Sequence, residues 1–205
     1  MFKTGSRSGT FLLVMGAVVA LVACSKPDAA GTDTGVATTD TGAAIADAGM
    51  APAPGAAPLT DANIVYILDQ SNLLDSASGA IAATKGTNSE VREFGKRMVR
   101  DHHGLRERGQ ALAKKLAVTP EAPANDNSKA ELDRVLTMLN GAGKGRPFDK
   151  AYIDDQVTYH INLLATATSA MSAAQNAELK NFIQKAAPTE QAHLDGAQAI
   201  QKKLM

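Results

Sequence analysis

Between residues 59 and 205, apolar side chains recur every three or four positions, and this helical period limits what the chain can fold into more than any other feature. No run alternates between apolar and polar residues for long enough to predict a β-strand. The sequence therefore predicts an all-α fold of four long helices and one short helix. A representative stripe is Val91, Phe94, Met98, His102 and Leu105.

Capping signals place the first two helices. Thr60 is a good N-cap for the first helix, and Gly86 should end it. Thr87 and Glu90 match a capping box, in which each side chain accepts a hydrogen bond from the other residue's backbone, so the second helix should begin there.

The remaining helices carry similar signals. Ser128 and Glu131 match a second capping box at the start of the short helix, and Pro147 suits the first turn of the next long helix. The last helix should begin near Glu178, and Pro188 inside it predicts a kink or a short break. Because the long connection between the second and third long helices carries the short one, we predict a ferritin-like four-helix bundle with one extra short helix in that connection.

Residues 1–23 have the features of a bacterial lipoprotein signal peptide. Basic residues precede an apolar run at 11–23, which is shorter than the ~20 residues that a membrane span needs. The run ends in small residues before Cys24, the chain's single cysteine. We expect Cys24 to be lipidated after cleavage, and Ser25 resembles an outer-membrane sorting signal. A plain secretory signal with a chance cysteine is the alternative.

The segment 24–58 is rich in Ala, Gly, Thr and Pro and nearly lacks large apolar residues. Such a composition cannot bury enough surface to offset the entropy of ordering, which predicts a disordered tether between the lipid and a domain at 59–205. The expected location is therefore the outer membrane, with the domain facing the periplasm. The expected partner is the membrane, through the N-terminal lipid.

Charge and nucleophile content exclude some classes of function. The 21 basic residues equal the 21 acidic ones, and nucleic-acid binding needs a basic surplus. Cys24 is expected to carry lipid, and no serine stands in a strand-to-helix elbow. We therefore expect a binding or structural role rather than an enzyme.

Three of the four histidines should meet inside the bundle. His102 shares the apolar stripe of its helix, whereas His103 points towards the rim or solvent. His160 and His193 stand equally far before and after the turn near residue 176, so they should face each other. Counting from the first turn places His102 near the same level.

A metal centre is one interpretation of this layer. Three imidazoles suit zinc, copper or iron, and Glu190 precedes His193 with the Glu-x-x-His spacing of di-iron bundles. A full di-iron site takes a carboxylate from each of four helices, and this chain supplies at best half of them. Asp75 in the first helix is a further candidate, somewhat off the apolar face.

Other interpretations remain open. The histidines could form a buried polar network with Asp101, Tyr152 and Glu190, without any ion. The layer could also line a pocket for a small ligand. A protein-interaction module would instead need an exposed apolar patch.

Three segments resemble a bacterial family of exported, ferritin-like proteins known as domain of unknown function 4142, often labelled outer membrane proteins. They are "VREFGKRMVRDHHGL" (91–105), "FDKAYIDDQVTYH" (148–160) and "PTEQAHL" (188–194), and the resemblance spans about 60–204. Its most specific element is the pair Asp101 and His102. Family members often carry a Glu in the first helix, where this chain has Asp75. The resemblance implies the fold and the location and supplies no activity.

Overall fold

The computed structural model describes residues 58–205, and this part of the chain is helical without strands. The prediction of an all-α fold is confirmed. The predicted signal peptide, Cys24 and most of the predicted tether lie outside the described residues. No helix in the described part is both long and apolar enough to cross a membrane. The helices are α1 (Asp61–Lys85), α2 (Ser89–Lys115), α3 (Ser128–Gly141), α4 (Arg146–Ala173) and α5 (Ala177–Leu204).

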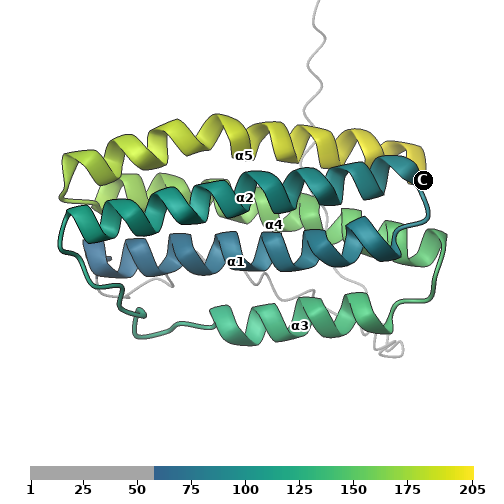
Figure 1. Ribbon diagram of the computed structural model, residues 1–205, viewed down its shortest axis with the longest axis horizontal. Coiled ribbons are helices and arrows are strands. Elements are labelled where there is room, and N and C mark those ends of the chain that lie inside the picture. Colours follow the sequence, from purple (N-terminus) through teal and green to yellow (C-terminus); the bar gives the residue numbers. More distant parts are fainter. Residues whose placement is uncertain (1–57) are drawn as a thin grey trace, which may run out of the picture. The chain divides into compact units, whose positions relative to one another are not determined.

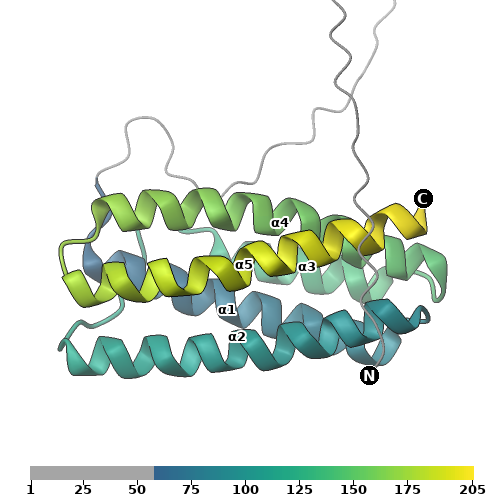
Figure 2. The same ribbon diagram turned by 90° about the horizontal axis from the view of Figure 1, so that it is seen from above.

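The four long helices form the predicted ferritin-like bundle. Helices α1 and α2 pack along each other as a hairpin, and α4 and α5 form a second one (Figures 1 and 2). The short helix α3 lies in the connection between the two hairpins, where it packs against α1 and α4. The extra short helix is thus where the sequence predicts it.

The helix starts differ in how well the sequence predicts them. Thr60 caps α1 as expected, in a reciprocal capping box with Asn63. The capping box predicted at Thr87 is wrong, because the N-cap of α2 is Asn88, whose side chain accepts from the backbone N–H of Glu90. The Thr87 hydroxyl donates instead to a carboxylate of α4, Asp149 Oδ2, at 2.6 Å.

The capping box predicted at the start of α3 is also wrong. Its N-cap is Asn127, which makes no side-chain capping bond. The Ser128 hydroxyl donates to Asp126 Oδ2 at 3.1 Å, and the Glu131 carboxylate accepts from Arg134 at 2.8 Å. In both helices, the side chain that a capping box would bond to a backbone N–H instead makes a hydrogen bond with another side chain.

Helix α5 runs without interruption through Pro188, so a break there is not formed. Ile183 and Leu194 are buried on either side of the proline, at 2% and 8% exposure. Packing of both halves against the bundle holds the helix together despite the backbone hydrogen bond that proline cannot make. Pro147 lies in the first turn of α4, as predicted.

The apolar core consists of two clusters, one towards each end of the bundle. One cluster includes Phe94, Met98 and Ala197, and the other includes Ala113 and Ile183. Along α2 and α5 the histidines stand between the residues of the two clusters. The fold therefore contains a polar layer at mid-height in an otherwise apolar interior.

Candidate metal centre

Helices α2, α4 and α5 each place one histidine in the polar layer, at His102, His160 and His193. All three are at most 1% exposed, and the ring centroids lie 5.0 to 5.9 Å apart. The structure thus brings together the three histidines that helix periodicity places at one level. His103 is exposed, as expected, and pairs with Glu107 of its own helix at 3.2 Å.

Each imidazole uses its outward nitrogen to donate a hydrogen bond to a group that can only accept. These acceptors fix the proton of each ring on the outward nitrogen and leave the inward nitrogen with a lone pair. The bonds run from His102 Nδ1 to Asn72 Oδ1 (3.0 Å), from His160 Nδ1 to the Gln156 carbonyl (2.9 Å) and from His193 Nε2 to Asp101 Oδ2 (3.0 Å).

The three inward lone pairs point at one another and at a carboxylate. His102 Nε2 lies 3.2 Å from His193 Nδ1, a contact that is a hydrogen bond only if one of these two inward nitrogens carries a proton. Glu190 Oε2 lies 3.7 Å from His102 Nε2, 3.6 Å from His160 Nε2 and 3.8 Å from His193 Nδ1. The four donor atoms all fall within 4.8 Å of one another. Hydrogen-bond acceptor atoms that face one another repel each other unless a proton or a metal cation lies between them.

Asp75 adds a second carboxylate to the layer. Its side chain is fully buried, and its Oδ2 lies 3.6 Å from His102 Nε2. The expectation that Asp75 lies off the inward face is wrong, because α1 turns this position into the bundle against α2. All four long helices therefore contribute a possible metal ligand to the layer.

Several of these buried atoms have no hydrogen-bond partner in the described part of the chain. They are both oxygens of Asp75, Oε2 of Glu190 and Nε2 of His160. A buried polar atom without a partner costs about 1–3 kcal/mol, and more when it is charged. A bound cation would satisfy all of them at once.

Burial sets the protonation of the layer. It lowers the pKa of His102 to about 3, with the neighbouring His193 acting in the same direction. Burial also lowers the pKa of His160 to about 4, although the charge of Glu190 opposes it. The pKa of Asp75 is raised well above its ordinary value by burial and by Glu190. Near neutral pH, His102 and His160 are therefore the neutral imidazoles that metal ions bind.

The other predicted site residues do not face this centre directly. Asp101 is 24% exposed at its side chain and holds His193 from outside. Burial raises the pKa of Asp101, but the His193 hydrogen bond and Arg100 outweigh it and leave the pKa lowered. Tyr152 packs edge-on against Phe94, and its buried hydroxyl makes no hydrogen bond to a histidine.

Asn72 is the functional residue that the sequence analysis missed. It accepts from His102 and donates its own amide to the Leu68 carbonyl at 2.6 Å, which fixes which end of the amide faces the histidine. The available signal was a polar residue near the edge of the apolar stripe of the first helix, next to the level of His102.

The donor set fits a tetrahedral ion. Four ligands at metal distances of about 2.0–2.1 Å lie about 3.3 Å from one another at the corners of a tetrahedron. The measured separations around Glu190 and between His102 and His193 are 3.2 to 3.8 Å. Shifts of a few tenths of an ångström in most of these separations would complete the coordination shell.

The fold and this donor set define a ferritin-like helical bundle with a histidine-rich centre. The chain belongs to the family described as "Domain of unknown function (DUF4142)", whose model matches residues 46–200. The structure is also similar to the crystal structure of a DUF305 fragment from Deinococcus radiodurans, with a TM-score of 0.60 and 13% sequence identity over 73% of this chain and 99% of that chain. Such a likeness shows the fold alone. No curated protein matches the sequence.

Proposed function

We propose that this protein binds a divalent transition-metal ion in its mid-bundle centre. The ligands are His102 Nε2, His160 Nε2 and His193 Nδ1 with Glu190 Oε2, and Asp75 is available as a fifth. The observation that carries the proposal is the convergence of three imidazole nitrogens and a carboxylate oxygen, all buried and within 4.8 Å of one another. An ion-free polar network leaves His160 Nε2 and Glu190 Oε2 without a hydrogen-bond partner in the described part of the chain.

The donor types favour zinc, copper or iron over magnesium or calcium, because imidazole nitrogen suits the former and oxygen the latter. The protein supplies every position of a tetrahedral shell, and the ligands are nearly inaccessible to solvent. Closed shells are typical of structural or storage sites, whereas catalytic sites keep a position open for substrate. The proposed role is therefore sequestration of the ion rather than catalysis.

The other two interpretations have less support. An interaction module should expose a broad apolar patch, and the large hydrophobic side chains exposed in the described part are Ile161, Met171 and Met205. A small-ligand pocket within the layer itself is disfavoured by the short distances between its side chains.

Titration calorimetry on the full chain, first stripped with a chelator, tests the proposal. Zinc, copper and anaerobic iron(II) are added in separate runs. At least one ion should bind with a dissociation constant below ~1 μM, equivalent to about −8 kcal/mol. His102→Ala should lose this binding because it removes a ligand.

His103→Ala is the matched control, since it removes the neighbouring exposed histidine of the same helix. It should bind the ion as the unmodified chain does. Absence of binding at ~100 μM for all three ions, or equal loss in both variants, contradicts the proposal.

We also propose that the bundle is carried by an exported lipoprotein of the outer membrane, facing the periplasm. The support is the sequence alone: a signal peptide over 1–23, Cys24 at the cleavage point and a tether over 24–58 ahead of a domain at 59–205. Two or more acyl chains on Cys24 would hold the protein at the membrane, because each buried CH₂ contributes ~0.8 kcal/mol.

Labelling with a radioactive fatty acid, followed by membrane fractionation, tests this second proposal. The unmodified chain should take up label and sediment with the outer membrane. Cys24→Ser should do neither, whereas Ser25→Ala keeps Cys24 and should still be labelled. Sedimentation of Cys24→Ser with the membrane would refute lipid anchoring.

A further inference from the structure

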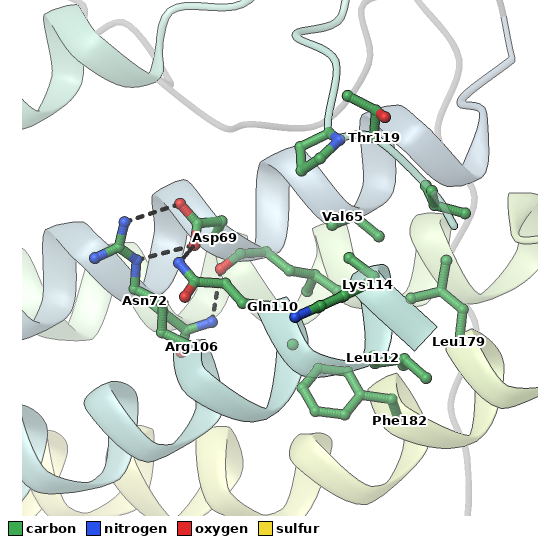
Figure 3. A pocket seen from close by; sticks show the side chains of 15 residues that line it. Val65, Asp69, Asn72, Arg106, Gln110, Leu112, Lys114, Thr119, Leu179 and Phe182 are labelled. Carbon is green, nitrogen blue, oxygen red and sulfur yellow. Dashed lines mark hydrogen bonds and ion pairs between the residues drawn. The ribbon is translucent and has the colours of Figure 1, made fainter. Parts of the chain in front are cut away.

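A cavity of about 330 Å³ opens between α1, α2, α5 and the segment that follows α2. Its volume lies at the lower end of the range for small-molecule sites. Figure 3 shows that its lining is divided: Asp69, Arg106 and Gln110 are joined at one end, and Leu112, Leu179 and Phe182 lie at the other.

At the apolar end, Gly109 leaves the Phe182 ring uncovered. A Cβ added at Gly109 would lie 3.6 Å from this ring, in van der Waals contact with it. Val65 of α1 and Leu179 of α5 form part of the surrounding wall. This end can accommodate an apolar group, and the side chains that form it make no hydrogen bonds to a polar one.

The polar end carries an excess of donors. Asp69 already accepts from Arg106 at 2.9 and 3.1 Å and from Gln110 at 2.7 Å, so its acceptor capacity is largely used. No acceptor in the described part of the chain pairs with Arg106 Nη1 or with the ammonium of Lys114, which also lines the cavity. The lining therefore has two cations and one anion, with Arg106 Nη1 and the Lys114 ammonium as unpaired donors among the described residues.

We propose that this cavity binds a small amphipathic carboxylate, such as a medium-chain fatty acid. The carboxylate pairs with Arg106 Nη1, with Lys114 as the second cation of the lining, and the chain lies along the apolar wall that includes Leu112, Leu179 and Phe182. At ~30 Å³ for each water-sized group, the volume holds roughly a dozen non-hydrogen atoms, the size of a ten-carbon acid. Asn72, which holds His102 of the metal centre, also lines this cavity, but Arg106 and Lys114 lie outside the proposed set of metal ligands.

Calorimetric titration of the full chain with decanoate tests the proposal, with 1-decanol as the uncharged probe. Decanoate should bind at least ~10-fold more tightly than decanol, a difference of about 1.4 kcal/mol. Lys114→Gln, which leaves the Asp69–Arg106 pair intact, should weaken decanoate binding and leave decanol binding unchanged.

Filling the cavity should abolish binding of both probes. Gly109→Leu places a side chain against the Phe182 ring in the lining, and the matched control Gly104→Leu, on the same helix, meets only the flexible Arg108 side chain. If circular dichroism shows that Gly109→Leu does not fold, Val118→Phe fills the cavity from the opposite wall. Decanoate that fails to bind at ~1 mM, binds no more tightly than decanol, or still binds the filled and folded variant overturns the proposal.

Discussion

Two buried aspartates of this bundle differ in the number of hydrogen bonds that their carboxylates accept. Asp149 in the first turn of α4 accepts three hydrogen bonds from the α1–α2 turn: from the Thr87 backbone at 2.9 Å, the Thr87 hydroxyl at 2.6 Å and the Asn88 backbone at 2.9 Å. We call these three residues the end clamp. Asp75 at mid-height is also buried, and in the part of the chain that the structure describes neither of its oxygens accepts a hydrogen bond of normal geometry, although the Gln156 side chain acts to lower its pKa.

The difference shows that the fold can satisfy a buried carboxylate with its own donors where the carboxylate serves structure. At mid-height three imidazoles surround Glu190, and one of them, His102, also lies beside Asp75, while each ring has an acceptor for its outward nitrogen. Such an arrangement costs stability in the free protein and becomes favourable when a cation enters. Four predictions sharpen this contrast, from the largest expected effect to the smallest.

Acid should destabilise the metal-free protein through its histidines. His102 and His160 have pKa values of about 3 and about 4 in the folded state, against 6.5 when unfolded. Below pH 6.5 the unfolded chain therefore binds more protons, and stability falls as the pH drops towards 4, by up to about 1.4 kcal/mol per pH unit for each histidine. Urea unfolding over this range measures the slope.

The raised pKa of Asp75 acts in the opposite direction, because the folded state then holds a proton that the unfolded chain releases. The measurement is therefore made with Asp75→Asn. In the Asp75→Asn background, His160→Gln should roughly halve the slope of the free energy of unfolding against pH. In the same background, Asp149→Ala should leave the contribution of the two histidines to this slope unchanged. A slope indifferent to His160→Gln would contradict the account.

Removing the two carboxylates should have opposite effects on the metal-free protein at neutral pH. Asp149→Ala should lower the free energy of unfolding by about 3 kcal/mol, because it leaves buried donors of the end clamp unpaired. Asp75→Asn removes a buried carboxylate that accepts no hydrogen bond of normal geometry from the described residues, and it should leave stability unchanged or raise it. Chemical unfolding of both variants measures these changes. A comparable loss of unfolding free energy in each variant would show that Asp75 is an ordinary structural residue.

The bound ion should stabilise the histidine layer and not the end clamp. At a free concentration 100 times its dissociation constant, the ion should add about 2.7 kcal/mol to the free energy of unfolding. Glu190→Gln should reduce this gain sharply, whereas Asp149→Ala should keep it while starting from a lower stability. Thermal unfolding with and without the ion measures the gain, and its survival in Glu190→Gln would remove that residue from the ligand set.

Asn72→Ala should weaken metal binding by about 10- to 100-fold, the usual effect of removing a hydrogen-bond partner of a ligand. The amide holds His102 in the orientation that points Nε2 inward. Asn63→Ala, a change on the same helix near its N-terminus, is the control and should leave the affinity unaltered. Equal affinity in both variants would mean that His102 needs no positioning.

The sequence predicts the histidine layer because the layer depends on helix periodicity and on distance from the turns, both of which are local. It predicts less about hydrogen-bond partners, because these depend on which side chains other helices bring near. Thr87 shows this directly: its motif suits a helix cap, yet Asp149, 62 residues further along the chain, takes its hydroxyl.

Asp75 and Asn72 illustrate the same limit at the site itself. Both are polar residues on a helix whose apolar stripe is broad, so periodicity alone places them near its edge. Packing of α1 against α2 turns them inward, and nothing within α1 encodes that rotation. The elements of the site were predictable, but the coordination geometry required the packed bundle.

The most direct test of the metal centre is a crystal structure of the chain grown with the ion that binds most tightly in the calorimetric titrations, with data collected at that metal's absorption edge. An anomalous peak at ~2.0–2.1 Å from His102 Nε2, His160 Nε2 and His193 Nδ1, with Glu190 Oε2 as a fourth ligand, is the predicted result. A peak elsewhere, or none between these side chains, would contradict the central claim.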